Sequence, residues 1–227
     1  MPHKNAKYRI DNAYHMDWVR TERCTGEWDM PILRRERLTP SRLLGFNYAL
    51  TSTRRDAGVH FFLDDYQFER IWGRTGDYVS RLASFECVLT PDFSLLMDMP
   101  AAMKIWNTYR NRAIGQFLQD NGCIVIPTVS WAEPASFSYC FDGLPTQGTV
   151  AVSSLGVIND PTALTAWHRG MDELLTRLAP IEILFYGKPI ERDYGSAQIR
   201  YFSDQRTGNM KGGSLWADAD HPTVSLR

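Results

Sequence analysis

The sequence predicts an α/β fold, with a mostly parallel sheet flanked by helices in a three-layer sandwich. Three observations lead to this prediction: short apolar runs recur along the chain, they are continuous rather than alternating, and helical patterns separate most of them. Continuous apolar runs are typical of parallel strands buried on both faces, and strand–helix alternation gives right-handed crossovers. An incomplete or small (β/α) barrel is the alternative, because 227 residues fall in the lower range of barrel lengths.

Five apolar runs are predicted to be parallel strands of one sheet, and they span 59–63, 86–90, 123–129, 149–153 and 181–186. Shorter candidates precede and follow them at 43–48 and 197–202. The pairing of 123–129 with 149–153 is the least determined, because the segment between them has no full helical pattern. An antiparallel pairing at that point is the alternative.

Helices are predicted at 66–84, 100–119 and 162–178. Asp160 and Pro161 precede the last of these as a side-chain cap and a first-turn proline. The segment 130–148 contains Pro134, Gly143 and Pro145 and is predicted to be a long loop with at most one helical turn.

The predicted domain organisation has three parts. Residues 1–40 are polar and poorly periodic, which indicates an irregular N-terminal arm. Residues 41–202 form the α/β domain, and the polar, glycine-containing residues 203–227 are predicted to be a flexible C-terminal tail.

Charge and cysteine content narrow the class of protein. The net charge of −1 excludes a basic field over the whole protein, although residues 1–57 carry eleven Lys and Arg against seven Asp and Glu, a balance of +4. This basic excess is interpreted either as a solvated face or as a patch for phosphate or an acidic partner.

Four separated cysteines with no CxxC pair argue against a disulfide framework. With no secretory signal or membrane-length apolar run, we expect a cytoplasmic protein without a membrane partner.

Carboxylates follow the predicted strands where a parallel sheet places its ligands. Asp64 and Asp65 follow 59–63, and Asp92 follows 86–90. Carboxylates brought together repel one another unless a proton or cation intervenes, and oxygen ligands suit Mg²⁺ or Mn²⁺. The sequence therefore predicts these three aspartates as catalytic residues and metal ligands. The alternative is structural, with Asp65 capping a helix and Asp92 in a Pro-Asp turn.

Four further residues are predicted to bind substrate. Trp131 follows 123–129, and Asp142 lies in the long loop, where an Asp-Gly turn is the structural alternative. Arg110 falls within an apolar stripe of the helix 100–119, and Asn107 lies one turn before it. A buried guanidinium needs a carboxylate or a bound anion, so Arg110 is either a structural partner of an aspartate at the strand ends or an anion clamp.

The inward stripe of this helix is predicted to consist of Met103, Trp106, Arg110, Ala113 and Phe117. The sequence contains no GxGxxG, P-loop, GxSxG or HxxxH pattern. It therefore gives no nicotinamide, flavin or zinc signal.

Four segments are distinctive when taken together: FFLDDYQFERIW (61–72), LTPDFSLLMDMPAAMKIWNTYRNRAIG (89–115), VIPTVSW (125–131) and FDGLP (141–145). They resemble an uncharacterised family, domain of unknown function 4417, found in bacteria, phages and mobile elements. The resemblance covers about residues 40–190. It implies a phage or mobile-element setting and brings no activity, cofactor or catalytic residue.

The leading functional hypothesis is a metal-assisted enzyme acting on a phosphate-bearing substrate, a nucleotide or nucleic acid. The alternative is a non-catalytic interaction protein that binds a host protein. An enzyme should have an open pocket lined by the carboxylates, whereas an interaction protein should have them paired and closed. The oligomeric state is left open by the sequence.

Overall fold

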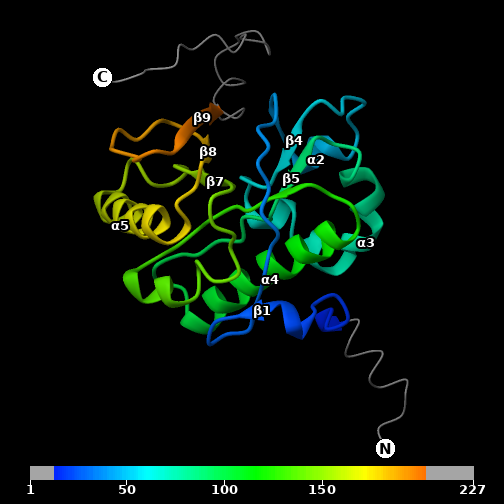
Figure 1. Cartoon of the computed structure of the whole chain (residues 1–227), viewed down its shortest axis with the longest axis horizontal. Coiled ribbons are helices and arrows are strands. Elements are labelled where there is room, and N and C mark those ends of the chain that lie inside the picture. The colour runs from blue at the N-terminus through cyan, green and yellow to red at the C-terminus, as the bar shows by residue number, and fades with distance from the viewer. Residues whose placement is uncertain (1–12, 203–227) are drawn as a thin grey trace, which may run out of the picture.

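The computed structural model describes residues 13–202 and confirms the α/β class (Figure 1). The first parallel sheet contains four strands in chain order: β3 (Leu43–Gly45), β4 (Gly58–His60), β5 (Cys87–Leu89) and β6 (Val125–Ile126). The second parallel sheet contains three: β7 (Thr149–Ser153), β8 (Glu182–Tyr186) and β9 (Gln198–Phe202). The residues predicted as a flexible tail, 203–227, lie outside the described range, as do residues 1–12.

The two sheets are joined where the pairing was least determined by the sequence. A parallel bridge connects Thr128 to Ala151, and it is extended by hydrogen bonds from Val129 N to Ala151 O (2.9 Å) and from Ala151 N to Pro127 O (2.8 Å). The segments 123–129 and 149–153 are therefore parallel neighbours, as predicted.

All seven strands consequently follow one another in sequential order. Within residues 13–202, β3 does not pair with β9, so the barrel is not closed. A sequential order with right-handed crossovers places the connecting helices on one face of the sheets. This order is the one expected of the alternative architecture, an incomplete (β/α) barrel.

Side chains on successive strand positions enter different apolar clusters. Val88 of β5 packs with α3 and α4, whereas its neighbour Leu89 enters a second cluster on the opposite face. In β8, Phe185 faces α5 and Leu184 faces that second cluster. We call this second cluster the inner cluster. Its buried members come from five of the strands and from the residues after β4: Leu43, Phe62, Cys87, Leu89, Ile126, Ala151, Leu184 and Tyr186. Burial on both faces explains why the strands appear as continuous apolar runs.

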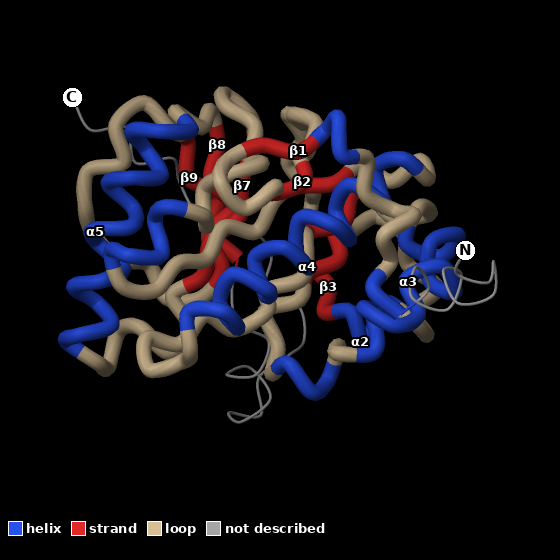
Figure 2. Tube along the Cα trace, turned by 90° about the horizontal axis from the view of Figure 1, so that it is seen from below, coloured by secondary structure: helices blue, strands red, loops and turns tan. Residues whose placement is uncertain are grey.

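The main helices are α2 (Phe46–Ala49), α3 (Arg70–Leu82), α4 (Ala101–Asp120) and α5 (Pro161–Leu178). The last three confirm the predicted helices, and the candidate strand at 43–48 divides into β3 and α2. Asp160 caps α5 as predicted, since its Oδ1 accepts hydrogen bonds from Thr162 N (2.8 Å) and Ala163 N (3.1 Å). The predicted long loop contains only one short 3₁₀ helix, η3 (Pro134–Ser138). Figure 2 shows the helices around the outside of the strands.

Residues 13–40, which we call the N-terminal segment, pack along α4. This segment contains a 3₁₀ helix, η1 (Thr21–Arg23), and an antiparallel pair of short strands, β1 (Cys24–Thr25) and β2 (Met30–Pro31). Two buried glutamines of α4 hold it through backbone atoms: Gln116 bonds Arg20 N, Arg23 O and Ile32 O, and Gln119 bonds both Arg34 N and Arg34 O.

This segment then reaches the second sheet. Glu36 O accepts a hydrogen bond from Thr149 N (2.8 Å), and Thr39 Oγ1 donates to Glu182 of β8. Leu38 packs against the inner cluster. No helix within residues 13–202 combines the length and the apolar character that crossing a membrane requires.

Candidate functional site

Two carboxylates at the strand ends tie successive loops together. Asp65 follows β4, and its carboxylate accepts hydrogen bonds from Ser94 N (3.2 Å) and Ser94 Oγ (2.9 Å) in the loop after β5. Asp92 follows β5 and accepts a hydrogen bond from Ser130 Oγ in the loop after β6. Each aspartate thus links the loop after its own strand to the loop after the next.

The environment of Asp92 shifts its titration. Removal from water raises the pKa of the Asp92 carboxyl to about 6, and the negative charge of Asp65 acts in the same direction. The hydrogen bond from Ser130 opposes this shift, because it stabilises the charged form. The Asp92 carboxyl therefore loses its proton at a higher pH than an ordinary aspartate does.

The third predicted metal ligand stands apart from this pair. Asp64 is exposed, and its Oδ2 accepts a hydrogen bond from Gln67 Nε2 (3.1 Å). The described part of the chain contains no group of three or more His, Cys, Asp or Glu side chains arranged to hold a metal ion. The structure thus brings Asp65 and Asp92 together electrostatically and does not assemble a three-aspartate centre.

Arg110 is buried, as predicted, with 7% of its surface exposed. Its guanidinium lies over the Phe93 ring, with Nη2 donating to Asn107 Oδ1 (2.7 Å) and Nη1 to Glu69. The expectation that the carboxylate partner would be Asp64, Asp65 or Asp92 is wrong. The chain turns through η2 (Asp65–Gln67) after β4, and the carboxylate at the start of α3 reaches Arg110 instead.

The predicted inward stripe of α4 is only partly correct. Arg110 and Ala113 are buried, but Met103 is 51% exposed and Trp106 38% exposed. The first two turns of α4 therefore present apolar side chains to solvent. Asn107, on the buried side of these turns, donates from Nδ2 to Ser94 O (2.8 Å) and so holds the loop after β5.

Trp131 and Asp142 belong to other contacts. The Trp131 indole packs against Gly170 of α5 and donates from Nε1 to Ala166 O (3.2 Å). The Asp142 carboxylate lies against Gly26, and burial raises the pKa of this carboxyl. These two predicted substrate-binding residues hold the loop after β6 to α5 and to the N-terminal segment.

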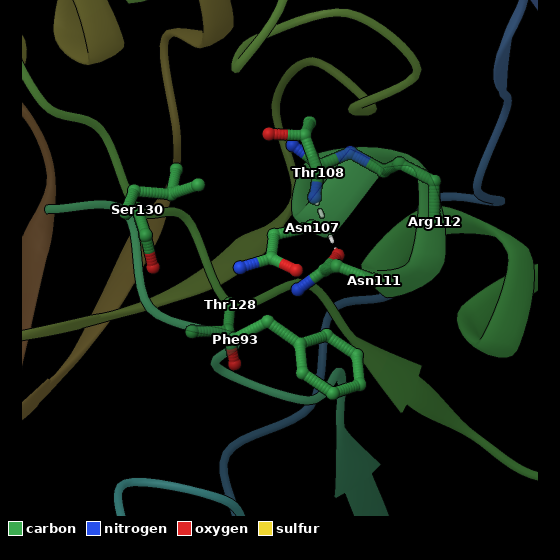
Figure 3. A pocket seen from close by; sticks show the side chains of 8 residues that line it. Phe93, Asn107, Thr108, Asn111, Arg112, Thr128 and Ser130 are labelled. Carbon is green, nitrogen blue, oxygen red and sulfur yellow. Dashed lines mark hydrogen bonds between the residues drawn. The ribbon is translucent and has the colours of Figure 1, made fainter. Parts of the chain in front are cut away.

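A small cavity of about 10 Å³ lies beside this network, between α4 and the loops after β5 and β6 (Figure 3). Its polar lining includes five residues that are not among the predicted site residues: Thr108, Asn111, Arg112, Thr128 and Ser130. Asn111 lies one turn after Asn107 on the same helix face, and this spacing of four was the available signal. Arg112 gave no such signal, because a second arginine so near Arg110 is expected to face solvent.

A buried lysine is a further feature that the sequence did not indicate. Lys104 Nζ lies 2.6 Å from both carboxylate oxygens of Glu133. The Lys104 side chain is almost fully buried, so the pair fixes the start of α4 to the loop before η3. We call the contacts Asp65–Ser94, Asp92–Ser130 and Lys104–Glu133 the strand-end network. We describe it as closed, because each of its carboxylates is already bonded to another group of the protein.

Comparisons with known proteins give the chain's relatives. It is 34% identical over 217 residues to the "Gene 1 protein" of Mycobacterium phage D29, covering 88% of this chain and 76% of that protein. It is 38% identical over 164 residues to the "Gene 1 protein" of Mycobacterium phage L5, covering 71% of this chain and 72% of that protein. No solved structure matches the chain significantly. The sequence profile that matches residues 22–203 is described as Domain of unknown function (DUF4417), and the chain therefore belongs to this family, which includes phage proteins.

Proposed function

We propose that the protein is a non-catalytic interaction protein that binds a host protein. The observation that carries this proposal is the closed state of the strand-end network. Asp65 and Asp92 are each bonded to a serine of the next loop, and the cavity beside them measures only about 10 Å³. Small-molecule sites normally enclose several hundred Å³, so this cavity is far below the size of a nucleotide site.

The surface best suited to a protein partner lies at the start of α4. We call it the α4 apolar surface, and it consists of Leu96, Met97, Met103 and Trp106. Leu96 is 56% exposed and Met103 51% exposed. The backbone carbonyl of Met97 lies 3.4 Å from Lys104 Nζ, so the loop before α4 folds back onto its first turns. Exposed apolar side chains that are concentrated in one stretch, here residues 96–106, are typical of interaction sites, and methionines adapt to varied partners.

The charges around this surface indicate the chemistry of the partner. Asp98 is exposed within it, and Lys104, the basic residue of the same turns, is buried on Glu133. A partner segment that combines apolar side chains with a basic residue is complementary to this arrangement. An amphipathic basic helix of a host protein has this composition.

The proposal is tested by a double substitution, Leu96→Glu with Met103→Glu. A photo-crosslinking side chain at position 97 first identifies the bound protein in bacterial cells, and the purified pair is then titrated. We expect the double variant to lose at least tenfold in affinity, because two charges would be buried at the interface. Tyr48→Glu, at an equally exposed site on α2, is the matched control and should bind normally. Equal affinity of the double variant and the control would overturn the proposal.

A second candidate is a metal-assisted enzyme that acts on a phosphate-bearing nucleotide or nucleic acid. The observation that favours it is the Asp65–Asp92 pair, in which Asp92 has a raised pKa. Magnesium commonly uses one or two protein carboxylates together with substrate phosphates. These two residues, rather than all three aspartates, would hold Mg²⁺ or Mn²⁺.

Metal titration distinguishes this candidate from the first. If the pair binds metal, Mg²⁺ or Mn²⁺ raises the melting temperature in a saturable manner, and Asp92→Asn abolishes the increase. Asp64→Asn is the control, because Asp64 is exposed and outside the pair. The enzyme candidate would be excluded if neither metal changed the melting temperature and the protein hydrolysed no nucleotide or nucleic acid. The interaction proposal would not be affected by that result.

A further inference from the structure

Arg112 is a buried cation whose hydrogen-bond acceptors are all neutral. It is 2% exposed and donates to Asp142 O (3.1 Å), Cys140 O (2.6 Å) and Asn111 Oδ1. Within residues 13–202 it forms no salt bridge. A buried charge is costly unless an opposite charge compensates it, so this guanidinium lacks the partner that its burial requires.

The nearest titratable groups do not supply that partner. Burial lowers the pKa of Arg112 to about 10, and the electrostatic influence of Cys140 and Asp142 only partly offsets this effect. The Asp142 carboxylate is turned against Gly26, and Arg112 contacts the backbone oxygen of Asp142 instead. The Asp92 carboxylate is bonded to Ser130.

Arg112 lines the cavity of about 10 Å³ together with groups that have hydrogens to donate (Figure 3). Asn111 Nδ2 donates one hydrogen bond, to Pro91 O, which leaves a second hydrogen on this amide. Asn107 Nδ2 donates to Ser94 O (2.8 Å) and to Met99 Sδ (3.9 Å), so its hydrogens are both engaged. The carbonyl oxygens of both amides are already occupied by Arg110 and Arg112.

Thr128 adds an independent observation. It lines the same cavity, it is 1% exposed, and its Oγ1 has no hydrogen-bond partner among the described residues. Buried hydroxyl groups are normally bonded, to protein or to a bound species. The cavity lining thus combines the uncompensated cation of Arg112, a spare amide hydrogen of Asn111 and the unpartnered hydroxyl of Thr128.

We propose that this cavity binds one monatomic anion, chloride, as the counterion of Arg112. A halide accepts several hydrogen bonds at once, and its negative charge would compensate the positive charge of the guanidinium. The size of the cavity favours an occupant of a single heavy atom and disfavours phosphate or sulfate. The anion would also join α4 to the loop that leaves β6, because Thr128 and Arg112 come from these two elements.

Bromide is the probe, because its anomalous scattering identifies it in a crystal. Crystals of the full chain grown in sodium bromide should give an anomalous peak in the cavity within hydrogen-bond distance of Arg112. In solution, chloride or bromide should raise the melting temperature saturably when it replaces gluconate at constant ionic strength. Gluconate is too large to enter.

Two isosteric variants make the test specific. Thr128→Val removes the cavity hydroxyl and should weaken the halide response about tenfold, the loss expected for one hydrogen bond to a charged group. Thr149→Val is the matched control, because Thr149 Oγ1 is also buried and unpartnered but does not line the cavity. It should respond to halide as the unmodified protein does.

Three outcomes would overturn the proposal. One is a cavity that holds a water molecule without anomalous signal in bromide-grown crystals. Another is a melting temperature that does not distinguish halide from gluconate. The third is an identical halide response in Thr128→Val and Thr149→Val. Arg112→Met should abolish the response, and the threonine pair keeps the test decisive if that variant does not fold.

Discussion

The guanidinium carbon of Arg110 lies 3.8 Å from the centre of the Phe93 ring, so a cation–π contact joins α4 to the loop after β5. Arg110→Met removes this contact and the hydrogen bonds to Asn107 and Glu69. The Glu69 side chain is 52% exposed and can return to water, so the loss is smaller than for a fully buried pair. We expect the free energy of unfolding to fall by about 1–3 kcal/mol in urea denaturation.

Arg110→Lys is the matched control for this prediction. It keeps the charge and loses the planar fork, so its stability should lie between those of Arg110→Met and the unmodified protein. If the Arg110→Met protein were as stable as the unmodified one, the contacts of the guanidinium with Phe93 and Glu69 would contribute nothing to the free energy of unfolding.

Asp92 should give the protein a measurable pH dependence. Its folded-state pKa, about 6, is raised above the ordinary value of an aspartate, so the folded protein binds more protons than the unfolded chain between these two values. The stability linked to Asp92 is therefore fully present below about pH 4 and is lost as the pH rises through 6, by up to about 3 kcal/mol. Asp92→Asn should abolish this decrease in urea denaturation from pH 4 to 7.5.

Ser130→Ala also tests the titration of Asp92, because it should move the pH of the transition rather than abolish the transition. The Ser130 hydroxyl favours the charged form of Asp92, so its removal should raise the Asp92 pKa further and move the loss of stability to higher pH. A pH profile that is the same in Ser130→Ala, Asp92→Asn and the unmodified protein would contradict the assignment of the transition to Asp92.

Gly170 of α5 should resist substitution because the Trp131 indole occupies the space of a side chain there. A Cβ at position 170 would collide with the ring, which is fixed by its bond to Ala166 O. Gly170→Ala should lower the free energy of unfolding by about 1–3 kcal/mol despite the better helix propensity of alanine. Gly76→Ala in α3 is the control, since nothing lies within 4 Å of a Cβ there, and it should leave stability unchanged or raise it. Equal effects at both positions would refute the packing argument.

Gln116 and Gln119 of α4 should be needed to keep the N-terminal segment packed against this helix. Gln119→Met leaves Arg34 N and Arg34 O without their partner. We expect faster amide hydrogen exchange over residues 20–35, measured by mass spectrometry, with little change in α5. Gln67→Met is the control, because Gln67 contacts Asn47 and Asp64 rather than this segment. Unchanged exchange in Gln119→Met would mean that apolar packing alone holds the segment.

Periodicity predicted the strands and main helices because their side chains pack against both faces of the sheets. Ala151, between Val150 and Val152, faces the inner cluster, while its neighbours face α5. Such a strand has a continuous apolar run, which the sequence displays directly. The sequential order of the strands depends on which distant segments pair with one another, and a local pattern does not encode that.

The candidate site was less predictable for two physical reasons. Asp65 and Asp92 were correctly placed at strand ends, but their serine partners lie 29 and 38 residues away in loops without periodicity. Helix α4 is buried on its polar sides as well, since Gln116 and Arg112 bond to backbone atoms of other segments. Polar residues in a helix normally indicate a solvated face, so the sequence pattern did not predict that Gln116 and Arg112 are buried.

The contact between Thr39 and Glu182, 143 residues apart, has a consequence for the order in which a ribosome delivers this chain. At about 5–20 residues per second, roughly 7–30 seconds separate the synthesis of these two residues. During that time Met30 and Leu33, both buried in the finished protein, lack part of the surface that covers them. The segment can therefore dock on α4 before β8 exists, whereas its contacts with the second sheet form only after β8 has left the ribosome.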